Sequence, residues 1–275
     1  MCAPAVLVQC LERLVAEGFR LALDDFGAGA ASFQYLSVLE VDVVKLDGSA
    51  VTRILVDCGL GIRILERRLA IAGLGTGDID ALFITHEHSD HVGCAQTLAL
   101  RERIPVWMSH GTWSAQGGRD YDGLLNTAEH GAAFEVGPLQ VHPFAVPHDA
   151  REPLQLTCTD GDRRLGVLTD LGHAPAEVLQ HLSGCHALLL ECNHDPDLLE
   201  ASAYPFFLKR RVGGAHGHLA NAQAAQVLRA VRHDGLNHVV AAHLSRKNNR
   251  PDLARIAVAG ALGRAEDEVL VADPI

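Results

Sequence analysis

Apolar residues along the chain follow two different spacings, which predict strands and helices mixed throughout the sequence. Spacings of three and four residues indicate helices, whereas short continuous or alternating apolar runs indicate strands. After residue 52 the pattern predicts helices over 62–72, 91–103, 175–182, 221–232 and 251–259. It predicts strands over 53–57, 80–85, 106–109, 133–136, 139–144, 154–158, 165–169, 187–191, 238–242 and 269–272. Strands mixed with helices in this way predict an α/β protein in which helices cover sheets.

The first fifty residues have a pattern of their own. It predicts a helix over 3–18, a strand over 19–25, a helix over 32–39 and a strand over 41–46. The pattern of apolar and polar residues changes at Arg53, where a new predicted strand begins. We therefore expect a fragment at 1–50, too small to be an independent domain, and one domain at 51–275.

Composition and charge limit the kinds of function that the chain is expected to have. Asp and Glu number 34 and Lys and Arg number 23, so the net charge is 23 − 34 = −11. An acidic chain is a poor general binder of polyanions, although this total leaves room for a local basic groove. Seven cysteines without a C-x-x-C pair, and no apolar run that could cross a bilayer, predict a cytoplasmic protein with free thiols and no membrane partner. Sixteen histidines point to metal binding.

The segment from Thr85 to His91 carries an H-x-H-x-D-H pattern directly after a predicted strand. Imidazole and carboxylate ligands suit borderline divalent ions such as zinc, and also manganese or iron. His86 and His88 lie two residues apart on an extended turn and can hold one ion, while Asp90 and His91 can turn toward a second. Glu87 lies between the ligands but points the other way, so we expect a structural role for it.

Two ions need further ligands, which should follow strands at the same edge of a sheet. His148 lies in a loop after a strand, Asp170 ends the strand over 166–169, and His243 ends the strand over 239–242. A carboxylate between the two ions is the natural role for Asp170. The alternative for each of these three residues is an ordinary loop position.

These residues resemble the metallo-β-lactamase fold superfamily over residues 52–275. The resemblance implies a four-layer αββα sandwich, here with an N-terminal helix–strand–helix–strand appendage. It also implies the ligand sets. His86, His88 and His148 would bind one metal ion, Asp90, His91 and His243 would bind the other, and Asp170 would bridge the two. Asp57 resembles the early structural aspartate of the superfamily.

Within the superfamily, five segments are similar to the YycJ/WalJ-like branch of metal-dependent hydrolases, some of which are described as DNA exonucleases. These segments are 146–150, 168–172, 191–195, 214–221 and 242–249. The chain departs from the branch at Ala220, where serine is usual, which removes one hydroxyl from a loop near the expected substrate site.

The first fifty residues resemble a different family, the EAL-type cyclic-di-GMP phosphodiesterases. The segments 21–29 and 41–49 carry this resemblance, and Asp24, Asp25 and Lys45 match family positions for metal binding and catalysis. One strand–helix–strand unit cannot close an eight-unit barrel, so we expect no EAL activity. This piece replaces the usual first strand of the YycJ-like proteins, and the strand over 41–46 is a possible substitute for it.

The sequence therefore predicts a hydrolase with two divalent ions, zinc or manganese, in which a metal-bridging hydroxide attacks phosphorus. We assign catalytic roles to Asp90, which can take the proton of the nucleophile, and to His218. Four further residues are expected to bind substrate: His194, Ser245, Asn248 and Asn249. The expected substrate is a phosphate-containing small molecule or a nucleic-acid end, and the oligomeric state stays open. Basic clusters at 209–211 and 246–247 either flank the cleft or form a solvated face.

Two other functions fit the same sequence. One is a carbon-ester, thioester or lactam hydrolase that uses the same metal site. The other is a non-catalytic nucleotide-binding fusion product built on the EAL-like piece.

Overall fold

The computed structural model describes residues 52–272, which form two compact units. Within that range, unit 1 comprises 52–143 and 150–154, and unit 2 comprises 144–149 and 155–272. The helix–strand–helix–strand appendage predicted for 1–50, including the possible substitute strand over 41–46, lies outside the described residues.

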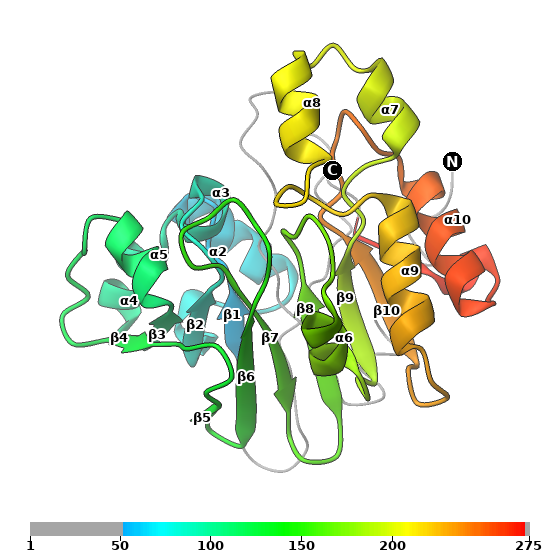
Figure 1. The fold of residues 1–275 in the computed structure, drawn as a ribbon. Helices are drawn as coiled ribbons and strands as arrows, with labels where there is room; N and C mark the ends of the chain where they lie inside the picture. The colour runs from blue at the N-terminus through cyan, green and yellow to red at the C-terminus, as the bar shows by residue number, and fades with distance from the viewer. Residues whose placement is uncertain (1–51, 273–275) are drawn as a thin grey trace. The chain divides into compact units, whose positions relative to one another are not determined.

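The main sheet of unit 1 is parallel, and its first three strands are largely buried. Its strands, in spatial order, are β1 (Ile54–Val56), β2 (Ala81–Ile84), β3 (Val106–Met108) and β4 (Leu125–Thr127). Its helices are α2 (Ile62–Ile71), η1 (Thr76–Asp78), α3 (Ser89–Val92), α4 (Ala95–Glu102) and α5 (His110–Ala115) (Figure 1). Leu82 and Ile84 of β2 pack with Leu65 and Leu98 of the helices in one apolar core. This packing explains why β1 and β2 are continuous apolar runs rather than alternating ones.

Unit 1 also contains an antiparallel pair, β5 (Phe134–Val136) and β6 (Leu139–Ala145). Gly137 occupies the turn with φ of 56°, a left-handed conformation that favours glycine. The ring of Phe134 stacks on Trp107 of β3, with the ring centroids 4.8 Å apart. The last two residues of β6 carry the chain into unit 2.

The prediction of a single helix over 91–103 is wrong. The structure has two helices there, α3 and α4, which are separated at Gly93. A Cβ atom at Gly93 would lie 2.4 Å from the backbone oxygen of Cys58, and one at Gly59 would lie 1.6 Å from the backbone oxygen of Asp90. Two loops therefore meet backbone to backbone, and only glycine fits on each side. This contact holds the loop after β1 against the loop after β2.

Unit 2 is built on strands that run, in spatial order, β11 (Leu270–Val271), β10 (His238–Ala242), β9 (Ala187–Glu191), β8 (Arg164–Leu168) and β7 (Leu154–Thr159). The first four are parallel to one another, and β7 is antiparallel to β8. Its helices are α6 (Ala176–Leu182), α7 (Pro196–Ala201), α8 (Phe206–Val212), α9 (Asn221–Val231), α10 (Pro251–Leu262) and η2 (Glu266–Glu268) (Figure 1). The parallel strands send their carboxyl ends, and the loops that follow, to one edge of the sheet.

The core of unit 2 lies where α6, α9 and α10 cover the sheet. Leu228 of α9 and Val258 of α10 are fully buried there. Burying a side chain of this size stabilises the fold by about 1.5–3 kcal/mol. Small residues such as Ala224 and Ala254 let α9 and α10 approach closely. Among the described residues, no helix combines the length and the apolar character that a membrane crossing requires.

Candidate metal centre

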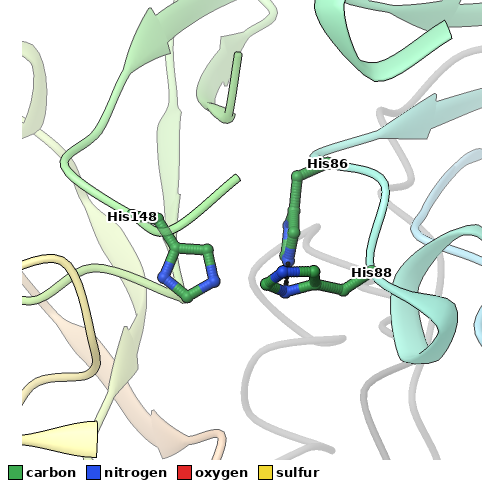
Figure 2. A group of neighbouring side chains, drawn as sticks. All are labelled: His86, His88 and His148. Carbon is green, nitrogen blue, oxygen red and sulfur yellow. Dashed lines mark hydrogen bonds between the residues drawn. The ribbon is translucent and has the colours of Figure 1, made fainter. Parts of the chain in front are cut away.

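The loop after β2 in unit 1 gathers the histidines of the H-x-H-x-D-H pattern. The Nε2 atom of His86 lies 2.9 Å from Nδ1 of His88, and Figure 2 shows the two rings edge to face in this loop. The ring of His91 lies 4.0 Å from that of His86, centroid to centroid. Three imidazoles that converge on one another from a seven-residue segment are a suitable arrangement for holding a cation.

Asp57, at the end of β1, organises this loop. Its Oδ1 accepts a hydrogen bond from the backbone N–H of Thr85 at 2.8 Å, and its Oδ2 lies 2.7 Å from Nδ1 of His91. The Thr85 hydroxyl donates to Asp57 and lies 3.0 Å from Nδ1 of His86. Both histidines therefore engage protein oxygens through Nδ1, which leaves Nε2 as the atom that can bind metal. Burial raises the pKa of Asp57, and His91 opposes that shift.

The two acidic residues of the loop occupy different positions. Oε1 of Glu87 accepts a hydrogen bond from the backbone N–H of Arg151 at 2.7 Å, in keeping with the structural role expected for it. Asp90 lies in the first turn of α3, with its Oδ2 atom 4.0 Å from Nε2 of His91 and its side chain partly exposed. Asp90 is thus the carboxylate of this loop beside the histidines.

In unit 2 the structure brings together the three predicted ligands that follow strands. Oδ1 of Asp170 lies 3.6 Å from Nε2 of His243 and 3.8 Å from Nε2 of His148. These distances exceed those of hydrogen bonds. Ligand atoms at about 2.0–2.2 Å from one tetrahedral ion lie roughly 3.3–3.6 Å from each other, so the His243 spacing fits coordination of one ion, and the His148 spacing is slightly longer. Figure 2 shows His148 on the loop that follows β6.

The backbone at these positions is strained. Asp57, Asp170 and His243 each follow the end of a strand, with φ of 62°, 51° and 57°. Residues other than glycine rarely adopt this left-handed conformation, and its occurrence clusters at functional sites. The apolar pattern of the sequence does not reveal this backbone conformation.

Glu191, the last residue of β9, is a functional residue that the sequence analysis missed. Its side chain is fully buried, at 0% exposure. Oε1 lies 2.7 Å from Nδ1 of His243 and 2.8 Å from Nδ1 of His218, while Oε2 accepts backbone hydrogen bonds from Leu171 and Leu219. Four polar partners explain how this carboxylate can be buried at the end of an apolar strand. The feature of the sequence that could have identified Glu191 is an acidic residue at the end of a buried apolar strand.

The electrostatics of unit 2 follow from this carboxylate. Burial raises the pKa of Glu191, but the charges and hydrogen bonds of His218 and His243 outweigh it and hold the pKa below its usual range. Burial lowers the pKa of His218, yet the Glu191 carboxylate outweighs burial and the net shift is upward. Burial lowers the pKa of His148, which keeps that ring neutral and able to bind metal. Nδ1 of His148 lies 3.1 Å from the backbone oxygen of Gly217, so its Nε2 atom faces Asp170.

The predicted substrate-binding residues lie in the same unit but have structural contacts. Asn249 exchanges amide hydrogen bonds with Asn221 and donates to the backbone oxygen of Cys192. The hydroxyl of Ser245 accepts from Asn248 at 3.2 Å, and His194 is buried. Their assignment to substrate stays a prediction.

The structure thus forms two sets of ligands. Unit 1 supplies His86, His88 and His91 with Asp90, and unit 2 supplies His148, Asp170 and His243. Glu191 lies beside the second set and holds His218 and His243 through their Nδ1 atoms. In unit 2 the ligand atoms of Asp170, Glu191, His218 and His243 all lie within 4.8 Å of one another. Imidazole nitrogens and carboxylate oxygens fit zinc or manganese. Assignment of both sets to one pair of ions stays a prediction.

Comparison with known proteins identifies the family of the chain. The model of the beta-lactamase superfamily domain matches residues 52–243, and the model of the EAL domain matches residues 3–66. An exodeoxyribonuclease YycJ from Bacillus anthracis is 33% identical over 220 residues, covering 78% of this chain and 83% of that protein. An exodeoxyribonuclease WalJ from Streptococcus pneumoniae is 29% identical over 254 residues, with 90% of each chain covered.

The fold is similar to that of solved structures. The metallo-beta-lactamase fold protein YhfI from Bacillus subtilis matches with a TM-score of 0.66 at 14% identity, covering 92% of this chain and 95% of that chain. This match confirms the fold predicted for the described residues. The EAL-like resemblance of the first residues is also confirmed, whereas the division into domains at residue 50 stays a prediction. The chain therefore belongs to the β-lactamase superfamily, has the metallo-β-lactamase fold, and is a hydrolase of that superfamily.

Proposed function

We propose that this hydrolase is a phosphodiesterase that removes nucleotides from DNA, using two divalent ions. The observation that carries the proposal is the way three predicted ligands are held. His91, His148 and His243 each engage a protein oxygen through Nδ1, which orients Nε2 for metal. The relatives from Bacillus anthracis and Streptococcus pneumoniae, both named exodeoxyribonucleases, support DNA as the substrate.

The resemblance to the superfamily assigns the ligands. By that resemblance, His86, His88 and His148 would hold one ion, Asp90, His91 and His243 would hold the other, and Asp170 would contribute to both. Divalent ions at these positions lower the pKa of a bound water toward about 7 and stabilise negative charge on the phosphate. The imidazole nitrogens of the donor set fit zinc, and its carboxylates also suit manganese.

Two side chains of the chain move protons in this proposal. Asp90 is partly exposed beside His91 and accepts the proton of the attacking water at its carboxylate. His218 donates a proton from Nε2 to the departing alcohol oxygen, because Glu191 fixes its Nδ1 atom and raises its pKa. The ring is 23% exposed, so it can reach a substrate.

Metal content and substrate choice test the proposal together. The full chain is loaded separately with zinc and manganese, and assayed on labelled DNA, bis-p-nitrophenyl phosphate, a thioester and a cephalosporin. We expect turnover of the two phosphodiesters. Turnover of the thioester or the cephalosporin alone would replace the proposal with a carbon-ester or lactam hydrolase. Tight binding of cyclic di-GMP without any turnover would support a nucleotide-binding fusion product.

A matched pair of variants links turnover to the predicted ligands. His88→Ala removes an imidazole that lies 2.9 Å from His86, and it should reduce phosphodiester turnover at least about a hundredfold. His110→Ala removes an exposed histidine of the same unit and should leave turnover unchanged. Equal turnover by the two variants would contradict the metal-dependent proposal.

A further inference from the structure

Helix α8 of unit 2 exposes two large aromatic side chains. Phe206 is 73% exposed and Phe207 is 72% exposed, well above the other exposed large apolar residues of the described chain. Helices α7 and α8 lie beyond the carboxyl ends of β9 and β10 (Figure 1). Two neighbouring phenylalanines in water contribute nothing to the core, so their position calls for a binding role.

Cations lie over aromatic rings at the same place. The guanidinium carbon of Arg210 lies 5.7 Å from the ring centroid of Phe206, and Nζ of Lys247 lies 5.6 Å from that of Tyr204. We call these five residues the aromatic–cation surface: Tyr204, Phe206, Phe207, Arg210 and Lys247. It joins α8 and the turn before it to the loop that follows β10.

The local charge is opposite to that of the whole chain. The segments 201–220 and 235–251 contain six of the 23 Lys and Arg residues and no Asp or Glu, although the net charge of the chain is −11. Arg211 pairs with Asp149 and Arg250 pairs with Asp252, whereas Arg210 and Lys247 contact rings. The other acidic residues nearby include those of α7 and its cap. A cationic, aromatic surface on an acidic protein complements a polyanion that also offers flat apolar groups.

The aromatic–cation surface is continuous with the candidate metal centre along the chain. The backbone N–H of His218 donates to the backbone oxygen of Val212, the last residue of α8, at 2.8 Å. Lys247 follows His243 by four residues in the loop after β10. The surface therefore adjoins His218 through the end of α8 and shares the loop after β10 with His243.

We propose that the aromatic–cation surface binds the single-stranded part of a nucleic-acid substrate. Bases stack on Phe206 and Phe207, and phosphates lie against Arg210 and Lys247. Stacking on exposed aromatic rings combined with a cationic track is the usual chemistry of single-strand binding without sequence preference. The inference rests on the proposed function, because it takes DNA as the substrate of this chain.

Binding is measured with the full chain, by fluorescence anisotropy of a labelled oligothymidylate of about 12 nucleotides. Chelator is present, so that the strand is not cleaved. We expect Phe206→Ser/Phe207→Ser to weaken binding at least about fivefold. Arg210→Gln and Lys247→Gln should each weaken it and make the affinity less dependent on salt. A blunt duplex of the same length should respond less to the phenylalanine variant, because its bases are already stacked.

The control is Ile256→Ser/Arg229→Gln, which removes an exposed apolar side chain and an exposed cation from other helices of unit 2. It should bind the strand as the unaltered chain does, and both variants should show the same melting temperature. Equal affinity of Phe206→Ser/Phe207→Ser and the control would overturn the inference. Unchanged strand binding together with a loss of dimers in sedimentation would also overturn it, because the surface would then belong to a second copy of the chain.

Hydrolysis of bis-p-nitrophenyl phosphate separates this inference from the proposed function. This small substrate has no nucleobases and no single strand, so the surface variants should hydrolyse it normally. If they do, and yet bind oligothymidylate normally, only the inference fails. If the unaltered chain hydrolyses no phosphodiester while strand binding still depends on Phe206 and Phe207, only the proposed function fails.

Discussion

Oε1 of Glu191 lies 2.7 Å from Nδ1 of His243, at the ends of two neighbouring parallel strands. The same oxygen lies 2.8 Å from Nδ1 of His218, so one buried carboxylate holds two imidazoles. In unit 1, Oδ2 of Asp57 holds His91 in the same manner at 2.7 Å. Each unit therefore orients its histidines with a buried acid that is not itself one of the predicted metal ligands.

Replacing this carboxylate should weaken metal binding. Glu191→Gln keeps the shape of the side chain but removes the charge that favours the Nδ1–H form of His218 and His243. We expect zinc affinity to fall about 10–100-fold, as measured by competition with a chromogenic chelator. The control Glu200→Gln changes an exposed acid on α7. Equal zinc affinity of the two variants would show that Glu191 has no part in orienting the ligands.

The stability of the metal-free protein should depend on pH through the same pair. Glu191 has its pKa lowered from 4.5 to about 2, so its contribution is present above pH 4.5 and lost as the pH falls toward 2. His218 has its pKa raised above 6.5, so its contribution is present below pH 6.5 and lost as the pH rises through the raised value. The pair should therefore stabilise the fold most between pH 4.5 and 6.5.

Urea unfolding with chelator present checks this prediction. The free energy of unfolding of His218→Gln is subtracted from that of the unaltered chain at each pH. We expect a difference of about 1.5–3 kcal/mol within the window, smaller on both sides of it, since the hydrogen bond involves charged groups. A difference that stays constant from acidic to alkaline pH would contradict the pairing.

The close contact between the two loops of unit 1 predicts that a glycine-to-alanine substitution there destabilises the fold. Gly59→Ala would place a Cβ atom 1.6 Å from the backbone oxygen of Asp90, so the loop that carries the histidines must shift. We expect a loss of about 3 kcal/mol in the free energy of unfolding, together with weaker metal binding. Gly61→Ala is the matched control, because nothing lies within 4 Å of its Cβ position. If both variants unfold alike, Gly59 is not needed for close approach.

Periodicity predicted the strands and the longer helices well. The strands over 187–191 and 238–242 are β9 and β10 with the same bounds, because continuous apolar runs in a buried parallel sheet are easy to recognise. It did not predict α5, α7, α8 or β4, which are short elements. Helix α8 has no buried residue, so it lacks the apolar face on which such predictions depend.

The candidate site was predictable where ligands lie close together in the sequence or end a strand. His86, His88, Asp90 and His91 form one short pattern, whereas Glu191 acts through partners 27 and 52 residues away. Spacing cannot reveal that His218 and His243 meet the same carboxylate oxygen, because only the folded sheet brings them together. The left-handed φ values of Asp170 and His243 are likewise set by tertiary contacts.

The number of metal ions bound per chain, measured by mass spectrometry of metals alongside phosphodiester turnover, tests the central claim most directly. We predict two zinc or manganese ions per unaltered chain, fewer in both His88→Ala and His243→Ala, and loss of turnover in each variant. An unaltered chain that hydrolyses phosphodiesters without bound metal, or a His88→Ala/His243→Ala chain that keeps both its metal and its turnover, would contradict the account.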